Sequence, residues 1–230
     1  MDGILAISKT VGITSYDVIR QVKKMLPRGV KIGHAGTLDP FASGVLLILL
    51  GKATKQFDEI QTWKKTYRAV ARLGAKSDTL DSTGIISEQK GGERNFATQR
   101  SDLCNTTKRF VGEIEQIVPA YAAAKYQGRK LYEYAREGVI IPEKKKIVTV
   151  YSIEVLGVTD NEFEMRVVCS SGTYIRQLSY DIMQTLGIES YLSVLEREAI
   201  GEITLENCAQ LNELTDVGKV EQRLLPVHGA

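Results

Sequence analysis

The segment GHAGTLDPFASGVL, which starts at Gly33, combines residue types that could do chemistry: His34, one of only two histidines, and the carboxylate of Asp39. Asp39 precedes a proline, which disfavours helical geometry at the aspartate and favours an extended or turn conformation. The glycines Gly33, Gly36 and Gly44 permit positive φ or close approach of another backbone. We therefore expect a loop that presents Asp39 rigidly, either as a reacting group or as an ordinary turn residue that hydrogen-bonds to nearby backbone.

Metal and nucleotide chemistry are poorly supported by the residue pattern. His34 and Asp39 alone supply too few ligands for a metal site. The three cysteines are widely spaced without a CxxC pair, so buried free thiols are expected: Cys104, Cys169 and Cys208. No Walker or dinucleotide-binding loop is present. We expect no metal and no cofactor.

The elements that must position the segment follow from hydrophobic periodicity. A buried strand is expected at Ile4–Ser8 and a helix at Ser15–Leu26, which Thr14 or Ser15 can cap. The apolar run Val45–Leu50 is too short to assign to a strand or a helix. Further strands are expected at residues 66–73, 147–156 and 163–170, the last two as a hairpin.

Two tyrosines have defined places in this pattern. Alternation over residues 66–73 turns Tyr67 inward, and Tyr174 and Arg176 lie at the start of a helix that ends at Gly187. Strands dominate and helices are interspersed without a strict βαβ rhythm. The predicted fold class is α+β with a mixed, largely antiparallel sheet.

Composition and charge narrow the class of protein. The chain has 230 residues, 43% hydrophobic and 25% charged, as in ordinary globular proteins. It lacks an apolar run of the ~20 residues that a membrane span needs, and its start, MDGILAISKT, does not resemble a signal peptide. We therefore expect a cytoplasmic protein without membrane association.

The net charge of +2 conceals segregated charges. Residues 18–38 contain five bases and no acid, residues 123–146 contain seven bases and three acids, and residues 196–230 contain seven acids and three bases. The second basic segment is rich in tyrosine. These segments favour a surface for phosphates and stacked bases, or else two solvated faces.

Five blocks, in order along the chain, resemble motifs of the TruB family of pseudouridine synthases, which isomerise uridine 55 in the T loop of tRNA. They are GHAGTLDPFASGVLLILLGKATK, KKTYRAVARLGAKSDTLDSTG, IEQIVPAYAAAKYQGRKLYEYAREG, CSSGTYIRQLSYDI and YLSVLEREAIGEITLE. The resemblance runs from about Gly3 to about Leu214. It implies a pseudouridine synthase catalytic domain at 1–214, with an RNA-gripping insertion at about 116–146.

The resemblance also implies what surrounds this domain. Residues 215–230 would form an acidic tail, without the C-terminal RNA-binding PUA domain that members commonly carry, and tRNA affinity would be weaker than in full-length relatives. The expected partner is the T-arm stem-loop of tRNA, the expected state is a monomer, and no cofactor is required.

The matching positions imply roles in the reaction. Asp39 would be the nucleophilic carboxylate, by attack at C1′, by attack at C6 or by a glycal route. Arg176 would pair with it and offset the cost of keeping it ionised in a dry pocket. Tyr67 would stack on the target uracil and relay a proton. Uridine in a T loop is stacked, so the enzyme must flip it out.

Further positions match residues that hold the RNA. His34 would fill the space that the flipped base leaves, and Tyr174 and Leu195 would contact the nucleotide. Asp81 matches an acid beside the cleft and Lys9 a lysine near the active-site strand, and either could be structural. Candidate phosphate contacts are Lys125, Arg129, Lys130 and Arg136, and Lys9 is a further possible RNA contact.

Some positions depart from the family pattern. Thr10 stands where proline is usual, Glu196 replaces the first arginine of a Leu-Arg-Arg run, and the insertion carries Val118 and Ala122. These changes bear on RNA affinity more than on chemistry. The alternatives are a non-catalytic tRNA-folding chaperone, a subunit of a guide-dependent pseudouridine synthase and a metabolic α+β enzyme.

Overall fold

The computed structural model describes residues 1–88 and 100–226. The chain divides into two compact units: unit 1 comprises Met1–Arg68 and Leu195–Ala230, and unit 2 comprises Ala69–Val194. Strands β4 (Lys65–Leu73) and β12 (Ser190–Ile200) each have residues in both units. The strands make a large mixed sheet, mostly antiparallel, with helices against it. This confirms the α+β class.

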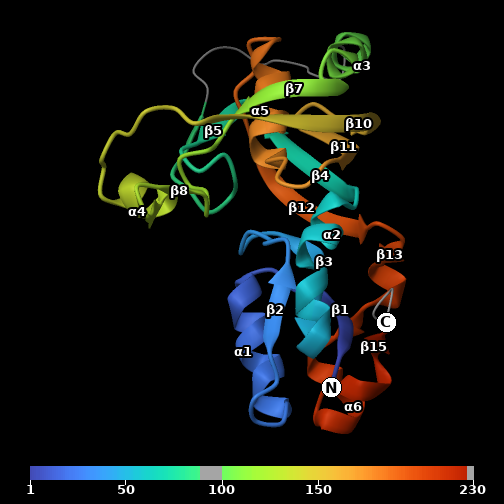
Figure 1. Ribbon diagram of the computed structural model, residues 1–230. Helices are drawn as coiled ribbons and strands as arrows, with labels where there is room; N and C mark the ends of the chain where they lie inside the picture. Colours follow the sequence, from blue (N-terminus) through green and yellow to red (C-terminus); the bar gives the residue numbers. More distant parts are fainter. Residues whose placement is uncertain (89–99, 227–230) are drawn as a thin grey trace. The chain divides into compact units, whose positions relative to one another are not determined.

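Unit 1 is built on strands in the order β14-β1-β3-β12, with β2 also paired to β3. Strands β1, β2, β3 and β12 are labelled in Figure 1. Its elements are β1 (Gly3–Lys9), α1 (Ser15–Met25), β2 (Ile32–Ala35), β3 (Ser43–Leu50), η1 (Gly51–Gln56), α2 (Phe57–Thr62), β13 (Ile203–Thr204), η3 (Leu205–Asn207), β14 (Ala209–Gln210), η4 (Leu211–Glu213), α6 (Val217–Gln222) and β15 (Leu224–Leu225). Strand β15 pairs with β1, so residues 217–225 are folded onto unit 1, and residues 227–230 of the expected tail lie outside the described part.

The apolar run that periodicity left unassigned is strand β3. Its residues are buried on both faces: Leu46, Ile48 and Leu50 belong to the core under α1, while alternate residues, such as Leu47 and Leu49, belong to the core that contains α2. A strand covered on both sides needs no polar alternation. That is why its sequence reads as a continuous apolar run.

Helix α1 follows its predicted start closely. Thr14 caps it with a capping box: the Asp17 backbone N–H donates to the Thr14 hydroxyl at 3.0 Å, and the Thr14 backbone N–H donates to the Asp17 carboxylate at 2.8 Å. Val18, Ile19 and Val22 form its buried stripe. The helix lies beside β2 in Figure 1 and covers one face of β1 and β3.

Unit 2 carries the order β4-β11-β10-β7, which can be followed across Figure 1. Its other elements are β5 (Ala75–Ser77), β6 (Ile86–Glu88), α3 (Arg100–Lys108), β7 (Gly112–Ile117), β8 (Lys125–Tyr126), β9 (Arg129–Lys130), α4 (Leu131–Arg136), β10 (Lys145–Val158), β11 (Glu162–Cys169) and α5 (Ile175–Gln184). Strands β10 and β11 form the predicted hairpin, with two register shifts. No helix in the described ranges 1–88 and 100–226 has the length and apolar character to cross a membrane.

Candidate active site

The Asp39 loop, residues 36–42, is shorter than the sequence suggested. His34 is not in it but on strand β2, paired with Ile48 of β3. Gly36 (φ +86°) and Gly44 (φ +111°) have the expected positive φ, whereas Gly33 lacks a positive φ and a Cβ there would meet no atom within 4 Å, so neither reason for a glycine applies at Gly33.

Buried groups fix the loop from below. The Leu38 backbone N–H donates to the Ser15 hydroxyl at 2.9 Å, and that hydroxyl donates to the Leu38 carbonyl at 3.2 Å. The Gly12 N–H donates to the Pro40 carbonyl at 2.7 Å. Leu38 is buried, Asp39 half-buried and Pro40 exposed. The Asp39 carboxylate therefore sits on a loop whose backbone is anchored at both neighbouring residues.

Arg197 fixes the opposite side of the same loop. It lies on β12, is 1% exposed, and donates from Nε to the Val45 carbonyl at 2.7 Å and from Nη2 to the Gly36 carbonyl at 3.1 Å. Its Nη1 reaches the Thr37 carbonyl at 3.4 Å and the Tyr67 hydroxyl at 3.5 Å. One buried guanidinium thus joins the loop, strand β3 and Tyr67.

Gly44 makes this arrangement possible. Strands β12 and β3 run parallel with Arg197 opposite Gly44, and a Cβ at Gly44 would overlap the Arg197 backbone. The positive φ and the close approach both require glycine. Beside it, the Ser43 hydroxyl lies 3.4 Å from the carboxylate of Glu196.

Lys9 is the second buried cation of unit 1. It is 1% exposed, and its Nζ donates to the carbonyls of Thr10 at 2.9 Å and Ile13 at 2.8 Å. Burial lowers the pKa of Lys9 to about 8, and the nearby Asp39 carboxylate opposes this shift by favouring the charged ammonium, whereas Arg197 adds to it. By the same attraction, the ammonium favours the ionised form of Asp39.

Three further predicted site residues belong to unit 1: Tyr67, Leu195 and His34. Tyr67 is 9% exposed and Leu195 is 6% exposed. Burial and the charge of Arg197 lower the pKa of His34, so its imidazole is neutral at pH 7. Its Nδ1 is buried without a hydrogen-bond partner among the described residues.

In unit 2, Arg176 forms a buried ion pair with Asp81. Arg176 Nη1 lies 3.2 Å from Asp81 Oδ2, with side chains 3% and 6% exposed. Arg176 also donates to the carbonyls of Thr79 at 2.6 Å and Tyr121 at 3.0 Å. The other Asp81 oxygen accepts bonds from Thr79 and Thr83. The predicted pairing of Arg176 with Asp39 stays a prediction.

Tyr174 precedes α5 and is held through its backbone. The amide of Gln116, which is fully buried, accepts from the Tyr174 N–H at 2.8 Å and donates to its carbonyl at 3.0 Å. The Lys146 ammonium lies 4.0 Å from the centre of the Tyr174 ring and donates to the Gly172 carbonyl. Burial lowers the pKa of Lys146 to about 8.

Comparison with known proteins decides the family. The family model described as TruB family pseudouridylate synthase (N terminal domain) matches residues 23–175. A tRNA pseudouridine synthase B of Dehalococcoides mccartyi is 40% identical, covering 100% of this chain and 76% of the relative. One of Bacillus pumilus is 39% identical, with the same two shares covered. The chain belongs to the TruB family.

Two solved structures are similar in fold. A chain of a Cbf5-Nop10-Gar1 complex is similar with a TM-score of 0.69 and 28% identity, covering 98% of this chain and 60% of that one. A chain of an H/ACA RNP bound to a substrate RNA that contains 2′-deoxyuridine has a TM-score of 0.64 and 28% identity, with 92% and 52% covered. This chain therefore spans less than two thirds of either.

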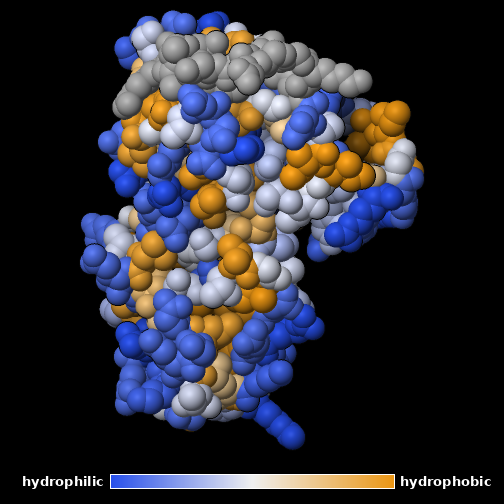
Figure 2. All heavy atoms as spheres, turned by 180° about the vertical axis from the view of Figure 1, so that it is seen from behind, coloured by the Kyte–Doolittle hydropathy of each residue, from blue (hydrophilic) through white to orange (hydrophobic). Residues whose placement is uncertain are grey.

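The insertion that the resemblance predicted as RNA-gripping contains the hairpin β8–β9 and α4, which extend from unit 2 at the left of Figure 1. Viewed from behind in Figure 2, this projection carries hydrophilic and hydrophobic residues side by side. Its four candidate phosphate contacts are exposed: Lys125, Arg129, Lys130 and Arg136. Arg129 is already engaged, at 2.6 Å from Glu137 and 3.7 Å from Glu133.

The cysteines and the metal-ligating side chains were also subjects of sequence expectations. Of the cysteines, Cys169 is buried, but Cys104 and Cys208 are only partly buried, so the expectation of three buried thiols was wrong for two of them. No group of three or more metal-ligating side chains occurs in the part of the chain that the structure describes. Arg197 is the residue that sequence reasoning missed, although its place in the family's Leu-Arg-Arg run was a usable signal.

Proposed function

We propose that this chain is a tRNA pseudouridine synthase that isomerises uridine 55 in the T loop of tRNA to pseudouridine. The observation that carries the proposal is the Asp39 loop, anchored by Ser15 and Arg197, in a chain whose relatives are named tRNA pseudouridine synthase B. A loop fixed on both sides supports a reacting carboxylate better than an ordinary turn residue does.

The reaction breaks the bond from uracil N1 to ribose C1′, turns the base and forms the bond from C5 to C1′. C5 then loses its proton and N1 takes up a proton, so that the product is an isomer of the substrate. Asp39 supplies the carboxylate, which must be ionised to act as a nucleophile. The ammonium of Lys9 favours that form, because it lies within electrostatic reach of Asp39. Attack at C1′, attack at C6 and a glycal route all use the same carboxylate.

The other residues prepare the base for this step. Tyr67, held near Arg197, stacks on the flipped uracil, and Leu195 and Tyr174 each contact the nucleotide. His34, neutral at pH 7, enters the space left in the RNA. Flipping costs a few kcal/mol, which stacking and phosphate contacts offset. Arg176 balances charge in the reacting complex, from its place beside Asp81.

The proposed substrate is the T arm, and the proposed enzyme is a cytoplasmic monomer that works without guide RNA or partner proteins. The test is tritium release from a T-arm stem-loop labelled at uracil C5, with the purified chain alone. Stoichiometric release, with pseudouridine at position 55 by mass spectrometry, supports the proposal. Binding without release would overturn it in favour of a tRNA chaperone, and release only after adding a guide RNA would indicate a guide-dependent subunit.

A further inference from the structure

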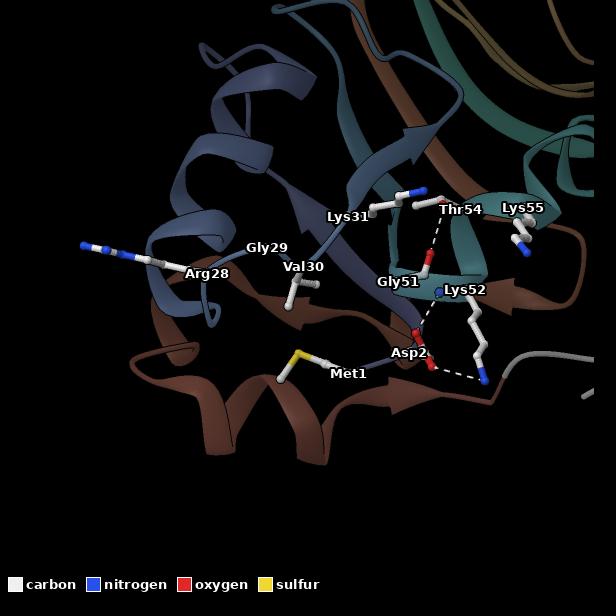
Figure 3. Close-up of a pocket in the computed structure, with 10 residues that line it drawn as sticks. All are labelled: Met1, Asp2, Arg28, Gly29, Val30, Lys31, Gly51, Lys52, Thr54 and Lys55. Atoms are coloured by element: carbon white, nitrogen blue, oxygen red, sulfur yellow. Dashed lines mark hydrogen bonds and ion pairs between the residues drawn. The ribbon is translucent and has the colours of Figure 1, made fainter.

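A pocket of about 420 Å³ that is lined by basic residues lies in unit 1, separate from the basic insertion of unit 2. It is formed by the N-terminus, the turn before β2 and the start of η1, as Figure 3 shows. Its lining includes four cations and one acid: Arg28, Lys31, Lys52, Lys55 and Asp2. Two of these cations belong to the acid-free basic segment at 18–38, which the proposed catalytic roles leave unexplained.

The lysines are not equally free to bind a ligand. Lys52 Nζ lies 3.9 Å from the Asp2 carboxylate, which also accepts the Lys52 backbone N–H at 2.7 Å. Within the described part of the chain, the ammonium groups of Lys31 and Lys55 have no hydrogen-bond or ion-pair partner, and both residues are exposed. In Figure 3, Lys31, Lys52 and Lys55 lie on one side of the pocket, whereas Arg28 points away from them.

The pocket is distant from the Asp39 loop within unit 1. Strand β3 begins at Ser43, next to that loop, and ends at Leu50, next to Gly51 of the pocket. Eight residues at about 3.3 Å each separate the two by roughly 25 Å along the strand. A ligand that reaches both places must therefore be extended, and the cations that line the pocket favour one that carries negative charge.

We propose that Lys31 and Lys55 bind backbone phosphates of the substrate tRNA outside the loop that reacts. The proposal rests on the proposed function for the identity of the RNA. Unpaired ammonium groups around an open pocket suit phosphates, because a lysine binds phosphate as a point charge and releases counterions from the RNA. The contact would add affinity without taking part in the chemistry.

The experiment compares Lys31→Ala/Lys55→Ala with the charge-matched control Lys108→Ala/Lys219→Ala, which removes two exposed lysines from α3 and α6. Binding of full-length, unmodified tRNA is measured from 50 to 200 mM salt, and turnover by tritium release. Two lost phosphate contacts should lower the slope of log affinity against log salt by about 2 relative to wild type. The ratio of wild-type to variant affinity for tRNA should therefore fall roughly tenfold between 50 and 200 mM salt.

The expected result is this lower slope and a raised KM in the pocket variant, with kcat unchanged at saturating tRNA and the control like wild type. An unchanged slope, or an equal change in the control, overturns the proposal. Calorimetry with pyrophosphate gives a second test. If the pocket variant loses pyrophosphate binding but keeps the wild-type affinity for tRNA, the pocket holds a free anion and the proposal is overturned. If wild type releases no tritium, the proposed function fails, but the binding comparison still decides on the pocket.

Discussion

Replacing Arg197 by methionine tests whether the buried guanidinium holds the Asp39 loop. The side chain is 1% exposed and makes two short hydrogen bonds, to Val45 at 2.7 Å and Gly36 at 3.1 Å. A hydrogen bond to a charged group contributes about 1.5–3 kcal/mol, so these two contribute about 3–6 kcal/mol. Methionine avoids the cost of burying a charge, which offsets part of the loss. We expect the free energy of unfolding to fall by about 3 kcal/mol.

The activity should fall further than the stability alone explains. A displacement of about 1 Å of a reacting group can cost on the order of 100-fold in rate, so we expect a kcat loss of this size at a temperature where the variant is folded. Arg197→Lys keeps the charge but cannot donate in the same directions, and it should also lose activity.

Urea denaturation and tritium release provide the two measurements. Arg223→Met is the matched control, because the Arg223 side chain is 54% exposed and its pair with Glu213 at 3.5 Å should contribute less than about 1 kcal/mol. The reasoning is refuted if the free energy of unfolding of Arg197→Met lies within 1 kcal/mol of the wild-type value. It is also refuted if the variant is destabilised but retains full kcat, since the guanidinium would then support the fold and not the reacting loop.

Three further predictions concern other groups. Because the pKa of His34 is lowered in the folded chain, the unfolded chain binds more protons, and the free energy of unfolding should fall as the pH drops below about 6.5. Denaturation measured from pH 7.5 to pH 5 should show a larger loss of stability for wild type than for His34→Asn. Arg176→Met and Asp81→Asn should each cost about 3–5 kcal/mol by leaving a buried partner unmatched, and a double-mutant cycle should show strong coupling; additive losses would refute the pairing. Gly44→Ala should be severely destabilised, because its φ is +111° and its Cβ would overlap the Arg197 backbone, whereas Gly138→Ala, at φ +68° in open space, should lose less by thermal melting.

Local patterns could be predicted from the sequence where local interactions decide them. The capping box at Thr14, the buried strand β1 and the hairpin of β10 and β11 depend on residues close together in the chain. Strand β3 could not be assigned, because burial on both faces removes the alternation that identifies a strand. His34 could not be placed for a related reason: its pairing to Ile48 depends on β3.

The residues of the candidate site are predictions from motifs, and the contacts that these residues make could not be predicted from the sequence. Arg197 and Val45 are 152 positions apart, and Arg176 and Thr79 are 97 apart, so no periodicity connects them. Asp39, Tyr67 and Arg176 are predicted as site residues through motifs alone. The anchoring of the loop by Ser15 and Arg197 becomes visible only once the strands are assembled.

The central claim is that Asp39 is the reacting carboxylate, and its most direct test replaces that group alone. Asp39→Asn keeps the size of the side chain and removes its charge, and Asp58→Asn makes the same change at an exposed position of α2. Tritium release from a T-arm stem-loop labelled at C5 is measured together with RNA affinity. We predict that Asp39→Asn binds the RNA but releases no tritium, while Asp58→Asn releases it like wild type. Release by Asp39→Asn at the wild-type rate would contradict the account.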